Sequence, residues 1–156
     1  MKHFAYIFTI LSVFLGITSC SNGGDDTPTP TPTPVIVHFT ASLTPVAGTG
    51  SLASGDAKLE FNQTAKTFEI TVTFTGLTAT TGHIHGADGA PVFPFSSFTS
   101  PIKQTYAISD AQIVELMANH YYVNLHSAAF PNGEISGFLM KGETSGGGGG
   151  GGGGSY

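Results

Sequence analysis

The sequence predicts an all-β domain with one short helix, covering residues 35–142 of the 156-residue chain. The main observation is that apolar and polar residues alternate along several segments, which is the period of a strand with one buried face. Gly, Pro and Asn separate these segments, as is typical of turns between strands. A single later segment has apolar residues at helical spacing instead. These patterns together indicate one β-rich domain of ordinary size.

Three early segments carry the strand pattern most clearly. Residues 35–43 alternate apolar and polar side chains, and this strand is expected to end at Pro45. Residues 57–62 follow with Ala, Leu and Phe on one face. The turn NQTAK then leads into 68–75, whose β-branched and aromatic residues suit a pleated surface. Gly76 is expected to end this third strand.

The helix is predicted from its cap. The motif SDAQ at residues 109–112 is a capping box, in which the Ser109 hydroxyl accepts from the N–H of Gln112 and the glutamine side chain returns to the cap. The helix is expected to stop near Asn119. Apolar residues at helical spacing should face the core, namely Ile113, Leu116 and Met117.

The helix is followed by a predicted hairpin. The segment YYVNLHS alternates, with Tyr121, Val123 and Leu125 on one face and Tyr122, Asn124 and His126 on the other. The motif FPNG is a turn, since Pro131 fixes φ and Asn132-Gly133 tolerates left-handed angles. The return strand is EISGFLM.

The N-terminus predicts export and lipid anchoring. Residues 1–19 combine Lys2 with an apolar stretch too short to span a bilayer, which is typical of a signal peptide. The stretch runs into Ile-Thr-Ser-Cys20, which resembles a lipobox, so Cys20 is the predicted lipidation site. The alternative is a general secretory signal beside a chance cysteine. Lipidation is favoured because Cys20 is the only cysteine and cannot form a disulfide within its own chain.

Two low-complexity segments flank the domain. Residues 20–34 alternate Thr and Pro and are predicted to form an extended tether with polyproline II character. Residues 143–156 contain nine consecutive glycines and are predicted to be a disordered tail. The acidic pair Asp25-Asp26 resembles the export signals of surface lipoproteins in Bacteroidetes-type bacteria. The expected location is the outer membrane, on the cell surface or periplasmic face, with the membrane as partner through the lipid.

Charge and motif content exclude several function classes. Without the signal peptide, four lysines face ten acidic residues, and the chain has no arginine, so nucleic-acid binding is not expected. No serine lies in a nucleophile elbow, and the glycine run lacks the following helix of a phosphate-binding loop.

The motif GHIHG is the strongest chemical signal. On a strand, His83 and His85 share one face, and their Cβ atoms lie roughly 6.6–7 Å apart, within reach of one metal ion. His126 is the expected third ligand, and three imidazoles suit copper or zinc. Asn124 and Glu134 are expected to lie beside these ligands, with the Glu134 carboxylate accepting a hydrogen bond that orients a ring nitrogen. The alternative is that these histidines bond loop backbone and hold a corner of the fold.

The order of motifs, in particular GHIHGADG and YVNLHSAAFPNGEISG, resembles the CHRD domain, named from chordin, over nearly all of residues 37–140. The resemblance implies an immunoglobulin-like Greek-key β-sandwich that is similar in outline to Cu/Zn superoxide dismutase. The family usually has a basic residue where this chain has Ser136. Dismutase activity is not expected, because that enzyme needs six histidines, an aspartate and usually an arginine. The function predicted from the residues is a non-catalytic surface module with a binding or envelope-associated role, and the alternative is a copper- or zinc-binding protein, with or without redox chemistry.

Overall fold

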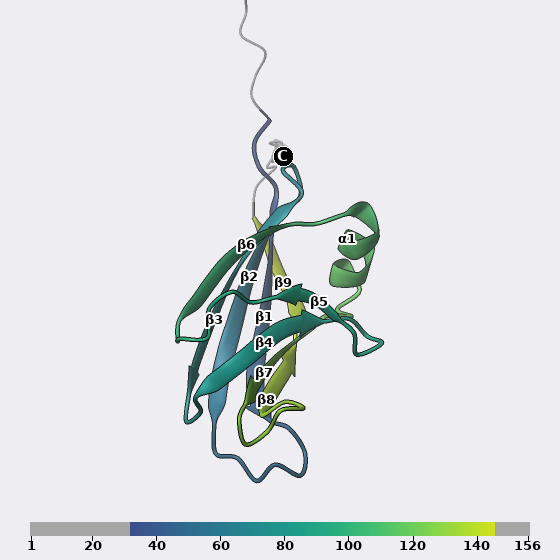
Figure 1. Ribbon diagram of the computed structural model, residues 1–156. Helices are drawn as coiled ribbons and strands as arrows, with labels where there is room; N and C mark the ends of the chain where they lie inside the picture. The colour runs from purple at the N-terminus through teal and green to yellow at the C-terminus, as the bar shows by residue number, and fades with distance from the viewer. Residues whose placement is uncertain (1–31, 146–156) are drawn as a thin grey trace, which may run out of the picture. The chain divides into compact units, whose positions relative to one another are not determined.

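The computed structural model describes residues 32–145 (Figure 1). The predicted signal peptide, Cys20, most of the tether and the polyglycine run lie outside the described residues. The elements in chain order are β1 (Ile36–Pro45), β2 (Ser54–Asn62), β3 (Thr67–Thr75), β4 (Ala79–His85), β5 (Pro91–Pro94), β6 (Ile102–Ala107), α1 (Asp110–Met117), β7 (Tyr122–Ser127), β8 (Ile135–Phe138) and β9 (Met140–Ser145). The expected all-β class with one short helix is confirmed.

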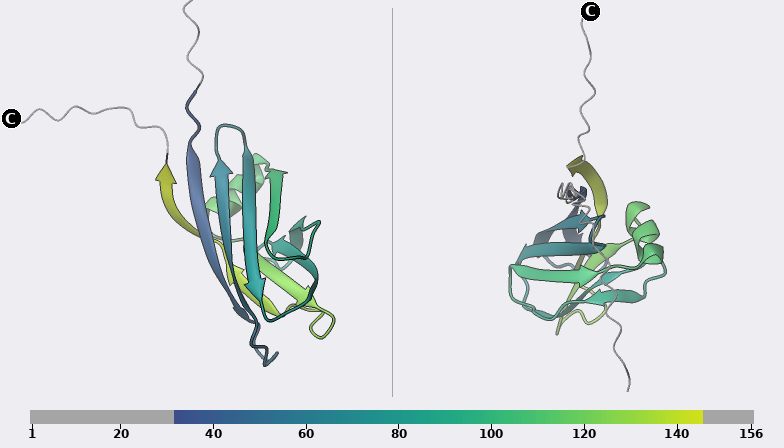
Figure 2. Two further views of the ribbon diagram at one scale, coloured as in Figure 1. Left: turned by 90° about the vertical axis from the view of Figure 1, so that its left-hand side faces the viewer. Right: turned by 90° about the horizontal axis from the view of Figure 1, so that it is seen from above.

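The strands form two antiparallel layers that share β1. One layer has the order β9-β1-β2-β3-β6, which the left view of Figure 2 shows side by side. The other has the order β5-β4-β7-β8 and joins the first where Thr44 and Pro45 at the end of β1 pair with β8. The chain returns from β8 in the second layer to β9, which pairs with β1 at the edge of the first layer. In Figure 1, β4 is seen crossing in front of β1 and β2.

The core lies between the two layers. Along β3, every second residue is buried, as the alternation in the sequence predicts. Both layers contribute fully buried side chains to one hydrophobic cluster, among them Phe39, Leu59 and Ile70 from the first layer and Ile84, Val123 and Leu125 from the second. Each such side chain contributes roughly 1.5–3 kcal/mol by leaving water. Burial of their inward-facing side chains therefore holds β4 and β7 against the first layer.

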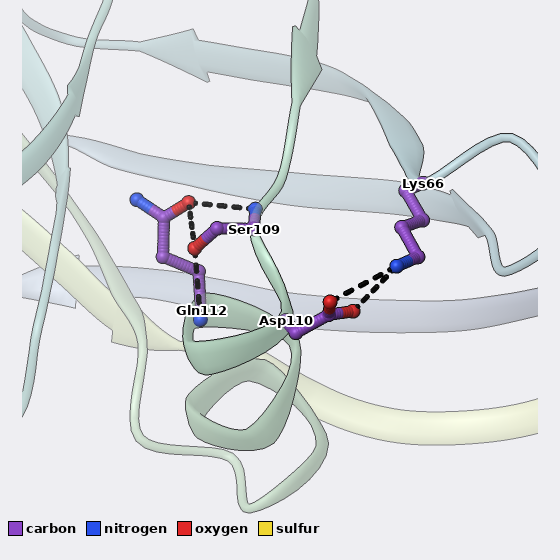
Figure 3. Close-up of polar contacts among 4 residues, drawn as sticks. All are labelled: Lys66, Ser109, Asp110 and Gln112. Carbon is purple, nitrogen blue, oxygen red and sulfur yellow. Dashed lines mark hydrogen bonds and ion pairs between the residues drawn. The ribbon is translucent and has the colours of Figure 1, made fainter.

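The helix begins and ends where the sequence predicts. Ser109 accepts from the Gln112 N–H, and the Gln112 side chain accepts from the Ser109 N–H, so both halves of the capping box are present (Figure 3). Lys66 Nζ lies 2.7 Å from Asp110 Oδ1 at the first turn, in an exposed ion pair. Leu116 is fully buried, and Asn119 has φ 60°, which ends the helix.

Three strands were not expected from the sequence. β5 and β6 lie in the segment between GHIHG and the helix, and β9 follows the predicted return strand. β9 continues to Ser145, which pairs with Ile36, so ordered structure extends three residues beyond the expected domain end at 142. The first part of the predicted disordered tail is thus an edge strand. Between residues 32 and 145, no helix is long and apolar enough to cross a membrane.

Candidate metal centre

The antiparallel pair β4–β7 places the three predicted ligands on one face. His83 is opposite Asn124 and Thr81 is opposite His126, so His126 is the diagonal neighbour of His83. His85 lies two residues beyond His83 on the same face. The alternate residues of both strands point into the core. This histidine face is therefore the outer face of the second layer.

The three imidazoles converge. Their ring centroids are 5.4 Å apart for His83 and His85, 5.5 Å for His83 and His126, and 6.0 Å for His85 and His126. One nitrogen of each ring lies within 4.8 Å of the other two. A metal ion bound by all three rings would have each ligating nitrogen at about 2.0–2.1 Å. Among the described residues, this is the only group of three histidine, cysteine or acidic side chains close enough to share an ion.

Each of the three rings has one buried nitrogen without a hydrogen-bond partner among the described residues. His83 Nδ1, His85 Nε2 and His126 Nε2 are all buried and unpartnered among residues 32–145. The other ring nitrogens of two of them are paired, since His85 Nδ1 lies 2.9 Å from the Gly89 carbonyl and His126 Nδ1 lies 2.9 Å from that of Pro131. A carbonyl only accepts, so each Nδ1 carries the hydrogen. In the neutral rings, each Nε2 then has its lone pair free for a metal.

The electrostatics of the cluster favour neutral rings. Burial lowers the pKa of His83, and the neighbouring His85 and His126 lower it further. Burial also lowers the pKa of His126, partly offset by its hydrogen bond to the Pro131 carbonyl. Metals bind the neutral imidazole, so the lowered pKa values keep His83 and His126 able to bind a metal at lower pH.

The sequence matches the CHRD domain family over residues 39–139. The chain belongs to the CHRD domain family. The match covers most of β1 through β8 and includes all three histidines of the cluster. The family expected from the sequence is thus confirmed. The comparison with curated proteins returns no match.

Two further residues of the CHRD domain were expected beside the cluster. Asn124 is 6% exposed and lies opposite His83, but its Nδ2 donates to the Asn132 carbonyl at 3.5 Å and its Oδ1 has no partner among the described residues. Glu134 is equally buried, and its Oε1 accepts from Ser51 Oγ at 2.7 Å. The orienting role expected of Glu134 is instead filled by backbone carbonyls at His85 and His126.

Residues that sequence reasoning missed lie in the turns of the two family motifs. Gly89, in GHIHGADG, supplies the carbonyl at His85, and Pro131, in FPNG, supplies the carbonyl at His126. Tyr122 was placed on the outer face but given no role, and its ring stacks on His85 at 5.1 Å and 14°. The sequence signal that could have indicated these carbonyls is that each turn follows a candidate ligand by only four or five residues.

The remaining described histidines, His38 and His120, lie at the surface. His120 Nδ1 lies 2.8 Å from Glu115 Oε2. His38 Nε2 lies 3.0 Å from Ser145 Oγ, with its Nδ1 3.8 Å from Glu60. Neither is part of the cluster.

Proposed function

We propose that the CHRD domain binds one copper ion through His83 Nδ1, His85 Nε2 and His126 Nε2. The observation that carries this proposal is that the three rings lie close enough to share an ion and that each has a buried nitrogen without a partner between residues 32 and 145. Buried polar atoms are ordinarily paired, so three unpartnered nitrogens on rings that lie together call for a shared partner. A metal ion satisfies all three at once.

The ligand set favours copper over other divalent ions. Imidazole nitrogen suits copper and zinc, whereas calcium and magnesium prefer oxygen ligands. Copper(II) binds a given nitrogen site more tightly than zinc does. Three protein ligands also leave a coordination position for water or a small ligand, unlike the closed four-ligand sites of structural zinc. Zinc is therefore the second candidate.

We further propose that this metal-binding module is non-catalytic and is held at the cell envelope. Support comes from the lipobox-like sequence ending in Cys20 and from the Thr/Pro segment that follows. At about 3.1 Å per residue, fourteen residues of polyproline II would reach roughly 40 Å from the lipid. The module would then bind metal or a partner away from the membrane surface.

The test of metal binding is a titration of chelator-treated protein with Cu²⁺, Zn²⁺ and Mg²⁺, followed by thermal unfolding. We expect copper to raise the melting temperature at a stoichiometry of one ion per chain, with a smaller rise for zinc and none for magnesium. At a free concentration of 100 times Kd, binding stabilises the fold by about 2.7 kcal/mol. A melting temperature that does not respond to copper or zinc would retire the proposal.

The test of anchoring is Cys20→Ser expressed in a bacterium that processes lipoproteins. The parent should pellet with membranes, and the variant should move to the soluble fraction, because no other thiol can take the lipid. A variant that still pellets and migrates unchanged on a gel contradicts anchoring through Cys20.

A further inference from the structure

We infer that Asp88 is a positioning residue of the metal centre, acting through the Gly89 carbonyl on the ring of His85. The inference rests on the proposed function, since the purpose of the arrangement is to keep His85 Nε2 free for a metal. Asp88 itself is exposed and lies three residues beyond His85, in the loop between β4 and β5. Its effect is on which nitrogen of His85 carries the hydrogen.

The loop from Gly86 to Ala90 is closed by a compact set of hydrogen bonds. The Gly86 N–H donates to the Ala90 carbonyl at 2.9 Å, and the Gly89 N–H donates to the Gly86 carbonyl at 3.0 Å. Asp88 Oδ1 accepts from the Ala90 N–H at 3.0 Å. Asp88 is the only residue that contributes a side chain to this set of hydrogen bonds. A substitution at Asp88 can therefore remove one of them and leave the backbone groups in place.

Two glycines make the loop possible. Gly89 has φ +81°, a left-handed conformation that side chains rarely adopt. A Cβ on Gly86 would lie 2.9 Å from Asp88 Oδ1. The sequence GADGA thus gives the carboxylate space beside Gly86 and directs the Gly89 carbonyl to His85 Nδ1 at 2.9 Å.

His85 is held from two directions. Tyr122 stacks on the face of the ring and restricts its tilt, while the Gly89 carbonyl accepts the Nδ1 hydrogen. An unconstrained neutral imidazole exchanges between two tautomers, one of which places the hydrogen on Nε2. That tautomer cannot offer Nε2 to a metal. Fixing the carbonyl therefore increases the fraction of molecules ready to bind.

The experiment compares Asp88→Ala, Asp88→Glu and Asp88→Asn with the parent. Asp56→Ala is the matched control, because Asp56 is also exposed but lies on β2 in the other layer. The first readout is the tautomer of His85 in the metal-free protein, from ¹⁵N chemical shifts of the ring. The second is the affinity for copper by competition with a chelator of known affinity.

We expect the parent, Asp88→Asn and Asp56→Ala to keep the hydrogen on Nδ1, because asparagine retains the accepting oxygen. Asp88→Ala should populate both tautomers and lose about tenfold in copper affinity, the lower end of the range for groups hydrogen-bonded to a metal ligand, because Asp88 acts through the Gly89 carbonyl. Asp88→Glu keeps the charge but displaces the oxygen, so it should behave like Asp88→Ala.

An unchanged tautomer and affinity in Asp88→Ala or Asp88→Glu overturns the positioning role. Equal losses in Asp88→Asn and Asp88→Ala would also overturn it, because charge rather than the accepting oxygen would then matter. The tautomer readout needs no metal. If the parent bound no copper, the proposed function would fail, while the ring shifts would still report whether Asp88 controls His85.

Discussion

The two faces of the β4–β7 pair differ in the side chains that they bury. On the inner face, Ile84, Val123 and Leu125 are completely buried in the hydrophobic core. On the outer face of the same strands, His85 and His126 are each only 8% exposed. The outer face therefore buries polar side chains at His85 and His126, although His83 and Tyr122 beside them are half-buried and Thr81 is exposed.

The difference lies in how well the buried atoms are satisfied. The inner residues need no partners, so their burial stabilises the fold directly. The outer face contains all four of the buried, unpartnered side-chain atoms found in residues 32–145: His83 Nδ1, His85 Nε2, Asn124 Oδ1 and His126 Nε2. A buried polar group without a partner costs about 1–3 kcal/mol. The inner face thus stabilises the fold, whereas the unpartnered atoms of the outer face lower its stability and leave the histidine nitrogens available to a metal.

The largest expected effect is on the inner face. Leu125→Ala should lower the free energy of unfolding by about 2–5 kcal/mol, because it opens a cavity in the core. Denaturant unfolding of the metal-free protein measures this loss. Copper affinity should change less than threefold, since the side chain points away from the histidines. A comparable loss of affinity would mean that the two faces are not independent.

His85→Ala is the corresponding change on the outer face. It removes one of three metal ligands, so copper affinity should fall by about 100-fold or more, equivalent to about 2.7 kcal/mol. The copper-dependent rise in melting temperature should disappear, while the variant stays folded. His120→Ala is the matched control, since that exposed ring pairs with Glu115 and should leave both properties unchanged.

The same variant separates the two sequence-based readings of GHIHG. If the histidines only hold a corner of the fold, the parent shows no response to copper. His85→Ala then loses roughly 1–3 kcal/mol of stability, because the Gly89 carbonyl loses its partner. If the histidines bind metal, the metal-free variant loses the same bond and a similar amount of stability, but the parent responds to copper and His85→Ala does not.

A smaller effect is expected from pH. The folded state lowers the pKa of His83 and His126 below 6.5, chiefly through burial, so the unfolded chain takes up protons at higher pH than the folded one. Stability of the metal-free protein should therefore be complete above about pH 6.5 and should fall as pH drops through the lowered values. Copper affinity should likewise weaken only below pH 6.5, because protons compete for the same nitrogens.

Denaturant unfolding at a series of pH values tests this, with His83→Ala and His126→Ala as comparisons. Each variant should lose part of the pH dependence below about pH 6.5. Variants with the full dependence of the parent would show that other groups cause it.

The long strands could be predicted from the sequence because each has one buried face. β1, β2 and β3 and the capped helix all have patterns that follow directly from burial and local hydrogen bonding. β9 could not be predicted in this way, since all six of its residues are exposed and it is held by backbone pairing with β1. β5 has only four residues, which is too short for a periodic pattern.

The candidate site was predictable in part. Side-chain alternation alone places His83 and His85 together, but the position of His126 depends on the β4–β7 register, in which it faces Thr81. No local pattern reports that register. Sequence reasoning also chose side chains as outer-shell partners, whereas the structure uses the carbonyls of Gly89 and Pro131. A carbonyl belongs to every residue, so its use depends on the turn geometry alone.

Glu134→Gln tests that last point and should have the smallest effect. The Glu134 carboxylate accepts from Ser51 Oγ, and a glutamine oxygen can accept the same hydrogen bond. The loss in unfolding free energy should be about 1 kcal/mol or less, because a neutral acceptor replaces a charged one. Copper affinity should stay within twofold of the parent, as measured by chelator competition. A tenfold loss would instead show that the carboxylate acts on an imidazole, and would return to Glu134 the role that the backbone carbonyls fill in this structure.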